Sequence, residues 1–106
     1  MTKYRAVPVT IDGIRFASKA EARRYTDLLL MERGGAIRDL ELQPRYPLVV
    51  NGVKVGTYVA DFRYVDEAGR VVVEDVKGVR TAVYRIKRLL MRALYGIEIE
   101  EVEVER

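Results

Sequence analysis

Hydrophobic and polar residues recur along this chain in patterns that predict both helices and strands. Residues 18–35, SKAEARRYTDLLLMERGG, carry apolar side chains at helical spacing, namely Ala22, Tyr25, Leu28 and Leu29. Ser18 opens the segment, Glu21 follows three residues later as in a capping box, and a glycine pair closes it. The pattern therefore predicts a helix over these residues.

Strand patterns lie on both sides of this helix. A short hairpin is expected around Asp12-Gly13, a dipeptide that favours two-residue turns. Residues 36–44, AIRDLELQP, are expected to form a loop. Two strands then follow at 45–50 and 53–65, separated by the strong turn signal Asn51-Gly52, and a third strand occupies 70–78. These segments predict an antiparallel set of strands.

The C-terminal third predicts one more helix and one more strand. From about Thr81, TAVYRIKRLLMRALYG has an apolar stripe of Val83, Ile86, Leu90 and Ala93, and Gly96 stands where a helix would end. The closing IEIEEVEV alternates apolar and acidic residues, as a strand does. The order, a short hairpin followed by α-β-β-β-α-β, indicates an α+β fold with a mixed sheet, formed as one domain over residues 1–106.

Composition narrows the possible chemistry. The chain has no cysteine and no histidine, which excludes disulfides, thiol catalysis, histidine acid–base chemistry and most zinc sites. A bound metal would need oxygen ligands, which favours Mg²⁺, Mn²⁺ or Ca²⁺. We find no apolar run long enough to span a membrane and no signal peptide, so a cytoplasmic location is expected. One asparagine, one glutamine and 33% charged residues resemble the composition of thermophile proteins.

Charged residues stand at the end of the third strand, which is otherwise apolar. Because side chains alternate across a strand, Asp75 and Lys77 share one face and Glu74 lies on the other. If Val65 pairs with Val71 across the preceding turn, Asp61 lies opposite Asp75. A four-residue loop would instead place Asp61 opposite Glu74 and send Lys77 to the other face.

Two facing aspartates repel each other by about 0.2–1 kcal/mol in an ordinary sheet. Either the Lys77 ammonium or a divalent cation held between the carboxylates would compensate for this repulsion. A purely structural interpretation is also open, in which Asp75 and Lys77 form an ion pair at a sheet edge and Asp61 caps a strand end.

An acidic residue in one strand, followed by acidic-x-Lys at the end of the next, resembles the signature of the PD-(D/E)XK nucleases. Here the motif comprises Asp61 in ADF and Asp75 and Lys77 in DVK. The phrases DGIRFASKAEARRY, LQPRY, YVADF and VEDVKG look like small phage-encoded members, and archaeal-type Holliday junction resolvases are relatives of similar size. Two departures are Ala60, where a proline is usual, and Asp75, where glutamate is commoner.

The resemblance implies a restriction-endonuclease-like core and a Mg²⁺-dependent endonuclease, with Mn²⁺ as a substitute. The implied catalytic residues are Asp61, Asp75, Lys77 and Glu21, and the metal ligands would be the three acids together with the Val76 carbonyl. Glu74 is an alternative ligand. Gln43 and Ser18 would support the site, although Glu21 could serve only as a helix cap and Gln43 could serve only to shape a loop.

Charge is distributed unevenly along the chain. The segment from Gly96 to Arg106 has five glutamates and one arginine, a net −4, which leaves +7 for residues 1–95. The basic residues expected to follow DNA phosphates are Lys3, Arg5, Arg80, Arg85, Arg88 and Arg92. An ordinary solvated surface is the other interpretation.

The resemblance favours a four-way DNA junction as substrate and, because two strands must be cut, a homodimer. The alternatives are a nicking or end-processing nuclease of the same fold, or an inactive DNA-binding protein.

Overall fold

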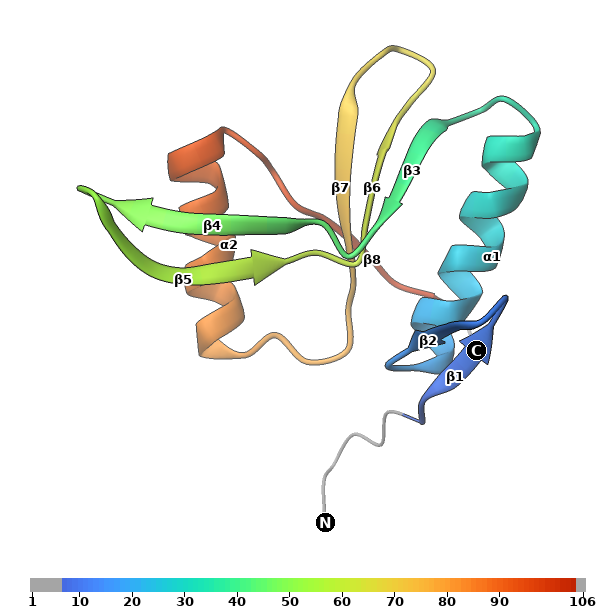
Figure 1. Ribbon diagram of the computed structural model, residues 1–106, viewed down its shortest axis with the longest axis horizontal. Coiled ribbons are helices and arrows are strands. Elements are labelled where there is room, and N and C mark those ends of the chain that lie inside the picture. Colours follow the sequence, from blue (N-terminus) through green and yellow to red (C-terminus); the bar gives the residue numbers. More distant parts are fainter. Residues whose placement is uncertain (1–6, 105–106) are drawn as a thin grey trace.

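The computed structural model describes residues 7–104 and shows an α+β protein with a mixed sheet and two helices (Figure 1). Lys3 and Arg5 lie outside the described residues. The chain begins with a hairpin of β1 (Val9–Ile11) and β2 (Ile14–Phe16), whose turn residue Asp12 has a positive φ of 53°. No helix in the described part of the chain is long and apolar enough to cross a membrane.

Helix α1 (Lys19–Arg33) forms where the sequence predicts it. The Ser18 hydroxyl accepts the backbone N–H of Glu21 at 3.1 Å, which satisfies one of the free donors of the first turn. Three of the four predicted apolar positions, Ala22, Tyr25 and Leu28, are buried. They pack with Phe16 and Phe62 in the larger of two apolar clusters.

The central sheet has four strands in the order β3-β6-β7-β8. They are β3 (Arg38–Leu42), β6 (Phe62–Val65), β7 (Val71–Val76) and β8 (Glu100–Val102). Strands β3, β6 and β7 are antiparallel, whereas β8 runs parallel to β7 after the crossover through helix α2 (Ala82–Tyr95). The sheet is therefore mixed, as predicted.

Two strand predictions are wrong. Residues 38–42 form β3 instead of a loop, and the expected strand 53–65 is broken at Ala60 and Asp61 into two strands. The first of these, β5 (Val53–Val59), pairs only with β4 (Arg45–Val50) in a separate two-stranded sheet, the β4–β5 arm, which lies against α2 (Figure 1). Without the arm and the first hairpin, the order is α1, β3, β6, β7, α2, β8.

Helix α2 also buries a different face from the one that the sequence predicts. Its one fully buried residue is Met91, with Tyr84 and Leu90 partly buried beside it, whereas Val83 and Ile86 of the predicted stripe are 61% and 59% exposed. The helix is capped at Thr81 and ends at Gly96, which has a positive φ of 67°. The predicted boundaries are therefore right and the predicted buried face is wrong.

Each helix side of the sheet has its own apolar cluster. The α1 cluster includes Phe62, Tyr64 and, at its margin, Val72, while the α2 cluster includes Val73. Strand β7 therefore contributes alternate residues to two layers, and its acids face opposite helices. This alternation positions the candidate site.

Candidate active site

The pairing of β6 with β7 settles the predicted register. Val65 lies opposite Val71 and Phe62 opposite Glu74, as the first of the two sequence alternatives requires. Asp61 stands one residue before β6, at the bend that separates β6 from the β4–β5 arm. Its backbone N–H donates to the Glu74 carbonyl at 3.1 Å, and its carbonyl accepts the Gln43 N–H at 2.9 Å.

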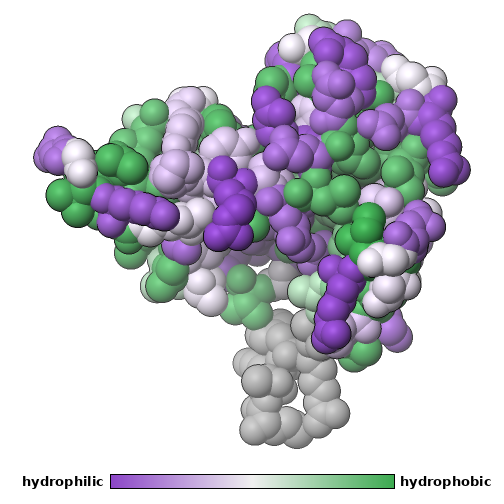
Figure 2. All heavy atoms as spheres, in the orientation of Figure 1, coloured by the Kyte–Doolittle hydropathy of each residue, from purple (hydrophilic) through white to green (hydrophobic). Residues whose placement is uncertain are grey.

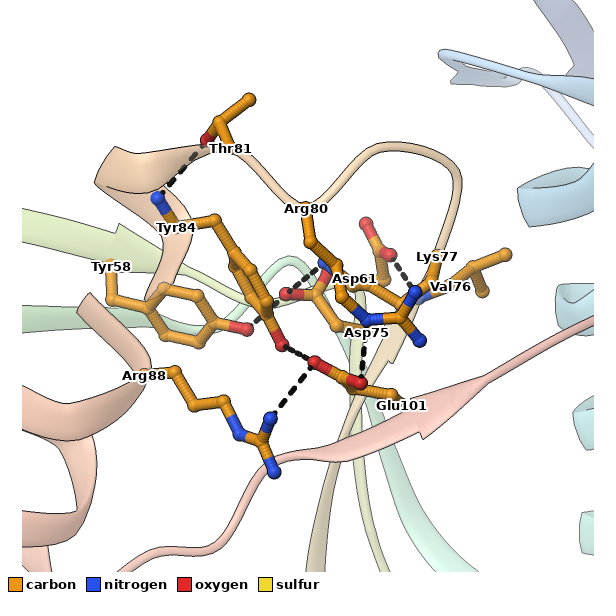
Figure 3. A network of polar contacts seen from close by, with 10 residues as sticks. All are labelled: Tyr58, Asp61, Asp75, Val76, Lys77, Arg80, Thr81, Tyr84, Arg88 and Glu101. Carbon is orange, nitrogen blue, oxygen red and sulfur yellow. Dashed lines mark hydrogen bonds and ion pairs between the residues drawn. The ribbon is translucent and has the colours of Figure 1, made fainter. Parts of the chain in front are cut away.

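The Asp61 side chain turns toward the end of β7. Its Oδ2 accepts the backbone N–H of Val76 at 2.7 Å (Figure 3), and its carboxyl lies beside that of Asp75. Burial first, and then Asp75 and the charge of Glu21, raise the pKa of Asp61 to about 8. The neighbouring acids and the loss of solvent thus favour the protonated form of Asp61.

Asp75 is buried and has two further partners. The Tyr58 hydroxyl donates to its Oδ2, and the Lys77 ammonium lies 3.4 Å from the same oxygen. Burial and then the Asp75 carboxylate raise the pKa of Tyr58 far above its usual value, so the phenol stays a donor. The same-face placement of Asp75 and Lys77 is confirmed.

The Lys77 ammonium is enclosed between a carboxylate and an aromatic ring. Its side chain is only 8% exposed, and Nζ lies 3.3 Å from the centroid of the Tyr84 ring. The Tyr84 hydroxyl in turn donates to Glu101 of β8 at 2.7 Å. Helix α2 and strand β8 therefore hold the lysine in place.

Glu21 reaches this group from α1. Its carboxyl lies beside Asp61, and burial is the main reason that its pKa is raised. The Ser18 hydroxyl caps the helix by accepting the backbone N–H of Glu21, and this bond fixes the backbone from which the Glu21 side chain projects. Glu21 thus lies in the first turn of α1 and faces Asp61, and its roles as helix cap and as metal ligand both stay predictions.

Glu74 belongs to a different environment. It is 1% exposed and faces α1, where Arg24 donates to both of its oxygens at 2.9 and 2.6 Å and the Tyr64 hydroxyl donates to one of them. All of these partners lie away from Asp75. The alternative in which Glu74 replaces Asp75 as a metal ligand therefore has no geometric support.

Gln43 supports the site through its backbone. Its φ of 50° is in the left-handed region and directs its N–H to the Asp61 carbonyl, while its side chain is exposed. The loop-shaping interpretation of Gln43 thus describes its contacts best.

The predicted arginines lie around α2, and three of them are paired. Arg80 and Arg88 contact Glu101 at 2.9 and 3.3 Å, and Arg92 contacts Glu98 at 2.5 Å. Arg85 has no ion-pair partner among residues 7–104. The acidic C-terminal segment therefore neutralises much of the basic surface that the sequence suggested.

Sequence reasoning missed Tyr58, Tyr84 and Glu101, which hold Asp75 and Lys77. No spacing rule identifies them, because they lie on β5, α2 and β8 and meet only in the fold. The single available signal was composition, since seven tyrosines with no histidine leave phenols as the main neutral donors of this chain.

The fold and site define an α+β protein in which a buried aspartate, Asp75, lies beside a half-buried one, Asp61, and an enclosed lysine. The chain belongs to the family described as "Protein of unknown function (DUF1064)", which it matches over residues 1–103. A search of curated proteins found no match.

Proposed function

We propose that this protein is a metal-dependent endonuclease of the PD-(D/E)XK type. The observation that supports it best is the meeting of Asp61, Asp75 and Lys77 at the end of β7, with Glu21 beside them. The order α1, β3, β6, β7, α2, β8 is also the order expected for that core, with the β4–β5 arm as an insertion.

The chemistry of the site suits a hard divalent cation. All the candidate donors are oxygens, and burial, followed by the neighbouring carboxyls of Asp75 and Glu21, raises the pKa of Asp61. Within residues 7–104, no group of three or more acidic side chains is already arranged as a metal centre. Asp61 and Asp75 would hold Mg²⁺ or Mn²⁺, with Glu21 and the Val76 carbonyl as further donors.

Each residue then has a distinct part in phosphodiester hydrolysis. A bound Mg²⁺ would supply Lewis-acid polarisation of a phosphate oxygen and a more acidic water. The Lys77 ammonium would stabilise the negative charge that develops on the phosphate. Tyr58 fixes Asp75 by a hydrogen bond, and the Tyr84 ring limits the positions open to the ammonium. Neither tyrosine needs to change its protonation.

DNA is the proposed substrate, and a branched molecule such as a four-way junction is the form that the resemblance favours. The arginine strip on one edge of α2, formed by Arg85, Arg88 and Arg92, borders a shallow hollow beside Leu89. Such a strip would contact phosphates and contribute no base readout, which suits recognition of backbone shape.

Cleavage assays test this proposal directly. Labelled four-way junction, duplex and single-stranded DNA are incubated with the protein in Mg²⁺ or EDTA. We expect Mg²⁺-dependent cleavage, fastest on the junction, that is lost in Asp75→Ala and Lys77→Ala. Lys87→Ala is the matched control, because Lys87 is also partly buried but donates to the Thr57 carbonyl at 2.8 Å. Cleavage by Lys77→Ala at the wild-type rate would exclude the proposed mechanism, and faster cleavage of duplex would favour a nicking enzyme.

A second candidate is a DNA-binding protein of the same fold without activity. The observation that favours it is the lack of an assembled group of three acids in the described residues. Junction binding that is retained in EDTA, with no cleavage in Mg²⁺ or Mn²⁺, would identify this function.

A further inference from the structure

Helix α2 exposes a row of apolar side chains on the side away from the molecule. We define the outer face of α2 as Val83, Ile86, Leu89 and Ala93. Val83, Ile86 and Leu89 are 61%, 59% and 59% exposed, and Ala93 is also exposed. At 3.6 residues per turn the four positions span about a third of the helix circumference. Contiguous apolar faces of this kind mark interaction sites more often than isolated exposed residues do.

The outer face carries no charged side chain. Its basic neighbours, Arg85, Arg88 and Arg92, lie together along one edge of the helix, and the inner side holds Tyr84 and Met91. A face without charges gives a polyanion nothing to bind. It can, however, meet an identical face without like-charge repulsion.

We propose that the outer face of α2 is the contact between two copies of this chain, packed as antiparallel helices about a twofold axis. A twofold axis perpendicular to both helices brings Val83 of one copy near Ala93 of the other, and Ile86 near Leu89. The same operation leaves the arginine edges of both helices on one side of the dimer. A parallel pairing would place these edges on opposite sides.

This arrangement deepens the proposed function and partly rests on it. Cutting two strands of a junction needs two sites, and the antiparallel dimer presents both basic edges to one substrate. Helix α2 follows Lys77 after a four-residue connection, 78–81, so the interface and the site share one element. In the proposed dimer, the two candidate sites are therefore connected through the two packed α2 helices.

The size of the contact sets its expected strength. Helix α2 has 14 residues and is about 21 Å long. One helix face of this length provides less area than the roughly 800 Å² per partner of a standard interface. We therefore expect a dimer that dissociates in the micromolar range.

The β4–β5 arm offers a rival surface and a matched control. It exposes Val49, Val53, Val55 and Val59 by 39–62%. Figure 2 shows green groups over this arm interrupted by purple ones, so that hydrophilic side chains divide its apolar surface. Val55, at 57% exposure, is as open as Ile86 but lies on the arm.

Sedimentation velocity over the micromolar range tests the inference without DNA. We expect wild-type protein to dimerise, Ile86→Glu to raise the dissociation constant at least about a hundredfold, and Val55→Glu to change it by less than about twofold. Because Ile86 lies near the twofold axis, an equimolar mixture of Ile86→Glu and Ile86→Lys should restore the dimer. Circular dichroism confirms that each variant is folded.

Three results would overturn the inference. They are a wild-type monomer at all concentrations, dimerisation of Ile86→Glu equal to wild type, or no restoration in the mixture. A dimer that forms as predicted by a protein without cleavage activity would contradict only the proposed function.

Discussion

Glu74 and Asp75 are adjacent acids on β7, both buried and each bound by a cation and a tyrosine hydroxyl, yet their surroundings differ in one respect. Glu74 faces α1 and is saturated by the paired donors of Arg24 and the Tyr64 hydroxyl. Asp75 faces α2, where the Tyr58 hydroxyl donates to it and the Lys77 ammonium lies 3.4 Å away, but a second acid, Asp61, also stands beside it. The comparison shows that burial alone does not separate an acid in a closed ion-pair network from an acid that has a second carboxyl beside it. The distinction lies in the second carboxyl, because Glu74 is bound by donors, whereas Asp75 meets its donors on one side and the Asp61 carboxyl on another.

The largest expected effect is on activity, on the Asp75 side. Asp75→Asn keeps the shape but removes a charge needed to hold a cation, so cleavage should fall by more than about a hundredfold. Rates on four-way junction DNA in Mg²⁺ measure this loss, with Glu74→Gln as the adjacent control. An equal loss in both variants would remove the distinction between the two acids.

The corresponding change on the Glu74 side should affect stability. Arg24→Met leaves a 1%-exposed carboxylate without its cation, which should cost about 3 kcal/mol of the free energy of unfolding. Urea denaturation measures it. The double variant Arg24→Met/Glu74→Leu should recover much of the loss, because it removes both charges together. If the single change costs nothing, the Arg24–Glu74 pair has no structural role.

The Asp61–Asp75 pair should make stability depend on pH. Since the pKa of Asp61 is raised in the folded state, from 3.8 to about 8, the folded protein binds more protons than the unfolded chain in this interval. Its contribution is fully present below the unfolded pKa and is lost as pH rises through the folded value. Metal-free protein should thus lose stability between about pH 4 and pH 8.

Two comparisons sharpen this prediction. Asp61→Asn should flatten the profile, and millimolar Mg²⁺ should restore stability at pH 8 because a cation favours the ionised pair. Melting temperatures in chelated buffer and in Mg²⁺ provide the measurement. A profile that Asp61→Asn leaves unchanged would show that other groups cause it.

The smallest expected effect concerns the arginine edge. Arg85, without an ion-pair partner in the described residues, should contribute more to DNA binding than Arg92, which Glu98 neutralises at 2.5 Å. Arg85→Ala should weaken binding and lower the salt slope by about one, with Arg92→Ala closer to wild type. Equal slopes in both variants would mean that the Glu98 pair opens on binding.

Part of this fold could be predicted from local rules. The Ser18 cap, the buried side of α1 and the turns at Asp12 and Asn51 follow from short-range chemistry. Strand alternation predicted that Asp75 and Lys77 share a face and that Glu74 lies on the other, while the pairing of Val65 with Val71 was one of two registers that the turn left open. The candidate acids were therefore accessible from sequence.

The remaining features depend on tertiary contacts. Helix α2 turns Tyr84 inward, although Val83 and Ile86 are more apolar, because the ring packs on Lys77 and its hydroxyl reaches Glu101. Strand β3 was missed because its burial pattern shows no fully buried residue. The pairing of Arg88 and Arg92 with C-terminal glutamates likewise exists only in the folded chain.

The central claim is that Asp61 and Asp75, and not Glu74, form a site for a hard cation. Calorimetric titration of the protein with Mn²⁺ tests this most directly, because it needs no substrate. We predict that wild type and Glu74→Gln bind Mn²⁺ with affinities within about threefold of each other and that Asp75→Asn shows no binding heat. No binding by wild-type protein, or equal binding by Asp75→Asn, would contradict the claim.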